Sequence, residues 1–167
     1  MNNFRNFVLA LALLAGLSAC GFQLRGSGSQ YNMPFKSIYL ALPETSSLGT
    51  ELRRHLRGSD KVDVLSDPAR AEATFEVISE NRAKSILSLN SQGRVREYLL
   101  TYTLVFRVRD ASGAEVLGAT EINLKRPLTF NESQVLAKES EEGLLYRDMQ
   151  TDLVQQILRR LAAVKPT

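Results

Sequence analysis

The sequence has little of what covalent crosslinks and metal sites require. Its 167 residues include one cysteine, Cys20, and one histidine, His55. A single cysteine cannot form an intramolecular disulfide, so the folded part must be held together by an apolar core. No metal-ligand spacing is visible either. We therefore expect no metal and no other cofactor.

Motifs of catalysis and a strong charge of one sign are also missing. There is no glycine loop for phosphate and no pair of carboxylates at a catalytic spacing, and His55 falls on the polar flank of a short predicted helix. The net charge is +3, and +2 without residues 1–19, which contain only Arg5 among charged residues. This is too small to indicate nucleic-acid binding. The sequence thus predicts neither an enzyme nor a nucleic-acid partner.

The first 19 residues have the three parts of a signal peptide. Arg5 precedes an apolar run over residues 7–17, and Leu17-Ser18-Ala19-Cys20 follows. The run is about half of the roughly 20 residues that cross a bilayer, so a transmembrane helix is the weaker interpretation. A cysteine directly after Leu-Ser-Ala resembles the lipobox of bacterial lipoproteins, which implies cleavage before Cys20 and acylation of its thiol. Gly21, where Asp would favour retention in the inner membrane, favours the outer membrane.

After the anchor, the pattern predicts a polar tether over residues 20–34 and a single α+β domain over residues 35–167. Short strands are expected at 35–42 and 61–65, with a helix at 48–56 between them. Alternating apolar residues predict three long strands between 72 and 130. A four-residue spacing of apolar residues predicts a long C-terminal helix, with Leu145, Met149, Leu153, Ile157 and Leu161 on its inner face. The expected fold is one layer of mixed or antiparallel sheet with long hairpins, packed on one face by two helices.

The hairpin register can be predicted from the turns at 91–93 and 111–113. Pairing Asn90 with Gly93, and Asp110 with Ala114, matches the apolar sides of all three strands. The predicted cross-strand pairs are Phe75–Val108, Val77–Phe106, Val108–Val116, Leu104–Thr120, Tyr102–Ile122, Leu100–Leu124 and Tyr98–Arg126. The charged side chains of Glu76, Glu80, Arg82 and Lys84 then fall on the opposite, outward face. That face also carries Leu99, Thr101, Thr103, Val105, Leu117 and Ala119. Such a face is less polar than is usual for a solvated sheet, which indicates an interface with another protein. Scattered exposed aliphatic residues, which are common on protein surfaces, are the alternative.

Three segments resemble one family. Cys20-Gly21-Phe22-Gln23-Leu24-Arg25-Gly26 follows the lipobox, and the segment 125–130 (KRPLTF) leads to Leu136-Ala137-Lys138. With the element order, these are similar to the lipopolysaccharide-assembly lipoproteins LptE, also called RlpB, over essentially the whole mature chain. The resemblance implies a non-enzymatic outer-membrane lipoprotein that plugs the lumen of the β-barrel LptD, helps it assemble and takes part in delivering lipopolysaccharide to the outer leaflet. An accessory lipoprotein of another envelope complex, such as the barrel-insertion machine, is the alternative.

The resemblance also implies binding of lipopolysaccharide through basic residues. A family lysine matches Lys138, whereas a family arginine at the first hairpin tip aligns with Ser91, a departure that Arg94 or Arg96 could compensate. The predicted register brings Lys84, Lys125 and Arg126 near the same tip. The candidate ligand-binding residues are Lys138, Arg94, Arg96, Lys125 and Arg126, since phosphates are bound by convergent cationic groups. Solvated charges that protect a sheet edge are the alternative.

Overall fold

The computed structural model describes residues 31–58 and 62–164. Its elements, in chain order, are β1 (Ser37–Ala41), α2 (Ser47–Arg57), β2 (Asp63–Leu65), β3 (Ala73–Leu89), β4 (Val95–Asp110), β5 (Glu115–Thr129) and α3 (Val135–Ala162), with 3-10 turns at Pro68–Arg70 and Glu132–Gln134. The predicted order of strands and helices is confirmed.

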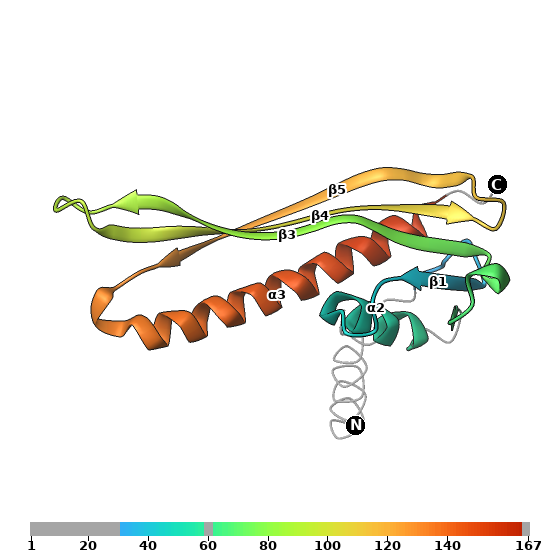
Figure 1. The fold of residues 1–167 in the computed structure, drawn as a ribbon, viewed down its shortest axis with the longest axis horizontal. Coiled ribbons are helices and arrows are strands. Elements are labelled where there is room, and N and C mark those ends of the chain that lie inside the picture. The colour runs from blue at the N-terminus through green and yellow to red at the C-terminus, as the bar shows by residue number, and fades with distance from the viewer. Residues whose placement is uncertain (1–30, 59–61, 165–167) are drawn as a thin grey trace, which may run out of the picture.

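The five strands form one open sheet in the order β2-β1-β3-β4-β5. Strand β1 runs parallel to β2 and to β3, and the pairs β3–β4 and β4–β5 are antiparallel. Both helices lie on the same side of this mixed sheet, and α3 runs along much of its length (Figure 1). The α+β fold with two helices on one face is confirmed.

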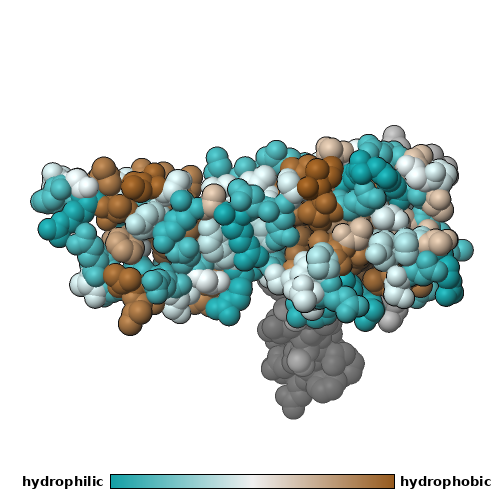
Figure 2. All heavy atoms as spheres, in the orientation of Figure 1, coloured by the Kyte–Doolittle hydropathy of each residue, from teal (hydrophilic) through white to brown (hydrophobic). Residues whose placement is uncertain are grey.

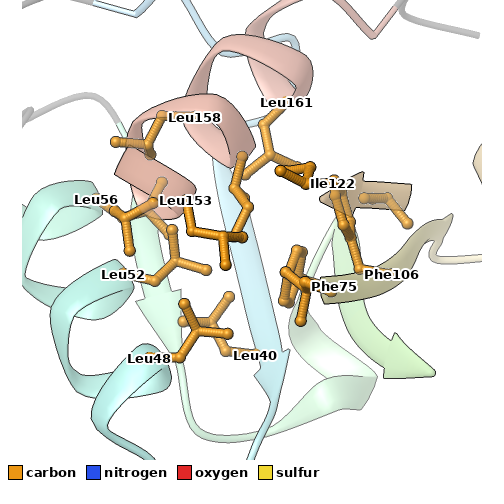
Figure 3. Packing of buried hydrophobic residues seen from close by; sticks show 14 of the residues in the cluster. Leu40, Leu48, Leu52, Leu56, Phe75, Phe106, Ile122, Leu153, Leu158 and Leu161 are labelled. Atoms are coloured by element: carbon orange, nitrogen blue, oxygen red, sulfur yellow. The ribbon is translucent and has the colours of Figure 1, made fainter. Parts of the chain in front are cut away.

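The core lies at the end of the molecule where α2, α3 and the sheet come together. Figure 3 shows the leucines of α2 and α3 pointing toward Leu40 of β1, Phe75 of β3 and Phe106 of β4. The rings of Phe75 and Phe106 are 5.1 Å apart at an interplanar angle of 30°. Ser46 caps the N-terminus of α2, and its side chain accepts a hydrogen bond from the Gly49 amide at 3.0 Å. Amphipathic spacing and a cap thus explain the element that closes this core.

The two long hairpins use the same turn. Asn90 and Asp110 each accept hydrogen bonds from the amides two and four residues later, and the glycine three residues later has a positive φ, 74° at Gly93 and 86° at Gly113. The Asp110 amide donates to Ala114 O at 2.9 Å, as predicted, but the Asn90 amide donates to Arg94 O. The predicted Asn90–Gly93 pair is therefore wrong by one residue.

Along β3, the set of side chains that faces the helices changes. Next to the core, the predicted pairs Phe75–Val108 and Val77–Phe106 are confirmed. A β-bulge at Ile78 then adds one residue to β3, and this one-residue slip turns the side chains from Ser79 to Ile86 to the other face, up to a second irregularity at Leu87. The prediction that Glu80, Arg82 and Lys84 face outward is wrong: they lie opposite Leu104, Tyr102 and Leu100, on the helix side.

The β4–β5 pairing shifts by two residues in total between Phe106 and Arg109. A two-residue shift keeps the faces, so the apolar side of β4 still meets the apolar side of β5, but the partners differ from those predicted. Val108 lies opposite Leu117, which packs against the core instead of facing outward. The remaining predicted pairs are replaced by Leu104–Ile122, Tyr102–Leu124, Leu100–Arg126 and Tyr98–Leu128.

Candidate interaction surfaces

The middle of the sheet side that faces away from the helices carries little charge. Alternation along β4 turns Leu99, Thr101, Thr103 and Val105 to this side, where they are half-buried between the neighbouring strands. Their partners are Ser79, Asn81, Ala83 and Ser85 on β3, and Glu121, Asn123, Lys125 and Pro127 on β5. Of these twelve residues, two are charged. We call them the outer sheet face, and no helix or strand among the described residues covers it (Figure 1).

On the outward side of the sheet, charged side chains cluster at the end next to the turn at residues 111–113. Arg107 donates to Glu76 at 2.6 Å and to Glu115 at 3.1 Å, and Arg109 lies 3.7 Å from Glu76. The hydrogen bond to Glu76 raises the pKa of Arg107. Because the two arginines are matched by two carboxylates, this cluster is close to neutral and offers no net charge to a ligand.

On the helix side, polar groups link β3 to α3 beyond the bulge. Arg82 donates to the Tyr102 hydroxyl at 3.0 Å and to Gln150 at 2.9 Å, and Tyr102 donates to Glu80 at 2.5 Å. Burial raises the pKa of Tyr102 to about 12, and the hydrogen bond from Arg82 opposes that shift. These contacts explain how three charged residues of β3 can face the helices: Arg82 and Lys84 bind Gln150 and Glu142 of α3, and Glu80 accepts from Tyr102 of β4.

Three of the predicted ligand-binding residues form ion pairs. Lys138 donates to Glu141 at 2.8 Å and to Thr129 at 3.0 Å, and 15 % of its side chain is exposed. The Arg94–Glu132 distance is 3.0 Å, and the Arg126–Asp152 distance is 2.5 Å. Within residues 31–58 and 62–164, neither Arg96 nor Lys125 has an ion-pair partner.

The five residues do not converge as the predicted register suggests. Lys138 reaches Thr129, which pairs with Glu97, so it lies about 10 Å along β4 from Arg94, at roughly 3.3 Å per residue. Arg126 lies opposite Leu100, about 20 Å from Arg94 on the same scale, and Lys125 projects from the other face. The structure therefore brings Arg94, Arg96 and Lys138 to one end, and leaves Lys125 and Arg126 apart from them.

That end of the molecule has no core. In hairpin residues 84–98 and in residues 135–148 of α3, which together we call the distal arm, no side chain is buried. Large apolar side chains are exposed there instead, among them Ile86 at 59 %, Leu89 at 53 % and Leu136 at 82 %. Figure 2 shows hydrophobic atoms gathered at the end formed by the hairpin tip and the start of α3. The sequence prediction missed these residues, although apolar positions on both faces of a hairpin end could have indicated them.

The signal peptide, Cys20 and most of the predicted tether lie outside the described residues. In the part that is described, no helix is long and apolar enough to cross a membrane, and no cluster of three or more residues of the metal-ligating types forms.

Comparison with known proteins gives a consistent family. The family LptE, described as lipopolysaccharide-assembly, matches residues 35–161. An LPS-assembly lipoprotein LptE from Pectobacterium atrosepticum is 27 % identical, and the match covers 96 % of this chain and 86 % of that protein. One from Yersinia enterocolitica is 28 % identical, and the match covers 94 % of this chain and 74 % of that protein.

Solved structures agree with the sequence relatives. The solution structure of an uncharacterized lipoprotein B from Nitrosomonas europaea is 41 % identical, with a TM-score of 0.71 over 86 % of this chain and 91 % of that one. The rare lipoprotein B from Shewanella oneidensis is 25 % identical, with a TM-score of 0.67 over 76 % of this chain and 94 % of that one. On the family match and these relatives, the chain belongs to the LptE lipopolysaccharide-assembly family of lipoproteins.

Proposed function

We propose that this chain is an outer-membrane lipoprotein, anchored through Cys20 on the periplasmic side, that plugs the β-barrel LptD and helps it assemble. In that position it takes part in delivering lipopolysaccharide to the outer leaflet. Residues 1–19 are then the signal peptide, residues 20–34 the lipidated tether, and residues 35–167 the single domain that enters the barrel. The role is one of binding and assembly, without catalysis.

The observation that carries this proposal is the outer sheet face. A sheet side with two charged residues in twelve is suited to contact with another protein more than with water. Its central strand β4 has 16 residues, which at roughly 3.3 Å each is about 50 Å. That length is comparable to the roughly 40 to 45 Å of a bilayer with its headgroups, so the sheet can line a membrane-spanning lumen from end to end.

The distal arm is suited to lipopolysaccharide. Arg94 pairs with Glu132 at the surface, and exposed pairs contribute only about 0 to 1 kcal/mol, so a phosphate can replace the carboxylate. Lys138, which pairs with Glu141, is a second cationic group on the same arm. The exposed side chains of Ile86 and Leu136 lie on the same arm and offer apolar contact to acyl chains. Charged and apolar contacts side by side fit an anionic lipid.

A co-purification experiment tests the barrel contact. Thr103→Lys places a charge at the centre of the outer sheet face, and we expect it to reduce the amount of LptD recovered with the chain. Thr45→Lys makes the same change at an exposed position before α2, on the helix side, and should leave recovery unchanged. Equal recovery for both variants would contradict the proposed contact.

The alternative partner is a different envelope assembly, such as the barrel-insertion machine. Stoichiometry separates the two, because a plug is expected at one copy per LptD barrel. Recovery with insertion components, and without LptD at equal amounts, would favour the alternative.

A further inference from the structure

At the opposite end of the molecule from the distal arm, a cavity of about 480 Å³ opens between α2 and the edge of the sheet. Its wall on the helix is formed by Thr50, Arg53 and Arg57, and its other walls include Tyr39 of β1 and Ser66, which follows β2. The volume is within the roughly 300 to 1,000 Å³ usual for small-molecule sites. Neither the outer sheet face nor the predicted basic residues contribute to it.

The amphipathic pattern of α2 produces this wall. Leu48, Leu52 and Leu56 are buried on one side of the helix, and the three- and four-residue spacing of Thr50, Arg53 and Arg57 puts these on the other. Gly49, which has no side chain, leaves room for the side chains of Leu42 and Arg53. An added Cβ there would lie 3.2 Å from the Leu42 Cβ and 3.3 Å from the Arg53 Nη2.

Among the described residues, no carboxylate neutralises the two arginines of the cavity. Arg53 donates only to the backbone oxygen of Glu44, at 3.4 Å. The Arg57 guanidinium has neither a hydrogen bond nor an ion pair with any residue in the described ranges 31–58 and 62–164. Glu44 lines the same cavity, yet its carboxylate pairs with neither guanidinium among these residues. This differs from Arg94, which has an acidic partner.

The remaining polar groups of the cavity suit a polyhydroxyl compound. The hydroxyls of Tyr39 and Ser66 have no hydrogen-bond partner within the described part of the chain, so they can bond to a ligand. The cavity also includes the half-buried side chains of Val64 and Leu65, which can pack on the apolar face of a sugar ring.

We propose that this cavity binds a phosphate monoester on a sugar-sized ring, with Arg53 and Arg57 holding the phosphate. Guanidinium groups match phosphate oxygens in a fixed, two-pronged geometry, and two of them one helical turn apart can share one dianion. A soluble sugar phosphate and a phosphorylated ring on a lipid share this chemistry. The site does not depend on the barrel contact, so either can fail without the other.

Titration of the full-length, isotopically labelled chain in non-ionic micelles tests the site, with chemical shifts of backbone amides as the readout. Glucose 6-phosphate should shift the amides of residues 50–57 and 64–66 saturably, and glucose should not. Phosphatidylinositol 4-phosphate in the micelles, against phosphatidylinositol, provides the lipid-linked arm. Tighter binding of one phosphorylated probe identifies the source, and the absence of saturable shifts with both would overturn the proposal.

Three variants connect the binding to the cavity. Arg53→Glu combined with Arg57→Glu should weaken binding by at least about tenfold, since each guanidinium gives a charge-assisted contact. Arg54→Glu reverses an exposed charge on the same helix outside the cavity and should bind as the wild type does. Thr50→Tyr keeps the charges and fills the cavity, so it should also abolish binding while other amides keep their shifts. A loss with Arg54→Glu equal to that of the double variant, or wild-type binding by Thr50→Tyr, would overturn the proposal.

Discussion

Truncating Phe106 tests which side of the sheet holds the fold together. The Phe106 side chain is fully buried, its ring lies 5.1 Å from that of Phe75, and its strand neighbours are Val77 and Thr120. Phe106→Ala removes the ring from a packed site whose named neighbours belong to β3 and β5, and the hydrogen-bonded strands cannot move inward to fill it. Core phenylalanine-to-alanine changes cost about 3 to 5 kcal/mol. That is a large part of the roughly 5 to 15 kcal/mol that stabilises a domain.

Urea denaturation of residues 21–167, made without the lipid anchor, measures this loss. The matched control is Val105→Ala, one position earlier on β4, whose side chain is half-buried on the outer sheet face. We expect a loss of about 1 kcal/mol or less for the control, with similar slopes against urea for both variants. Similar losses of unfolding free energy at the two positions would refute the assignment of inner and outer faces.

The remaining predictions concern the anchor, pH and the ligand. Cys20→Ser should leave the precursor uncleaved or the protein mislocalised, and mass spectrometry of the wild-type N-terminus should find an acylated Cys20; an unmodified cysteine would contradict the anchor. The pKa of Tyr102 is raised from 10.0 to about 12, so the folded state holds this proton more tightly: the stability it contributes is complete below pH 10 and is lost as the pH rises toward 12. Tyr102→Phe should remove this part of the pH dependence of unfolding, and identical curves for variant and wild type would argue against it. Lys138→Asp, or Arg94→Glu with Arg96→Glu, should weaken lipopolysaccharide binding more than alanine does, more strongly at low salt, with little change in melting temperature; unchanged affinity in titrations would leave these residues as solvated charges.

Local pattern was sufficient for the elements of the fold but not for the register of β3. The four-residue spacing from Met149 to Leu161 and the alternation of β4 depend on neighbours in sequence, and both were predicted. The bulge at Ile78 turns Arg82 toward α3, where it donates a hydrogen bond to Gln150, a residue far along the chain. A pattern that places all charged residues outward cannot anticipate such a partner.

For the candidate sites, too, the sequence could predict contacts between near neighbours in the chain but not contacts that depend on the fold. The pairing of Lys138 with Glu141 is local and follows from helical spacing, whereas Asp152 meets Arg126 only because α3 crosses under β5. The cavity beside α2 was missed because Arg53 and Arg57 resemble ordinary solvated charges in the sequence. Their environment is set by the end of β2 at Leu65, and no local pattern records where an edge strand stops relative to a helix.

The lack of buried side chains in the distal arm divides the molecule into two mechanical parts. We call the part of the molecule around the core, where α2, α3 and the sheet meet, the base. Local opening is opposed mainly by buried apolar contacts, so amide hydrogens of the arm exchange through openings that leave the base intact. The arm can therefore open and close while the base stays folded. Any change in the arm on contact with a partner would then alter the contacts of the arm alone and leave the stability of the base unchanged.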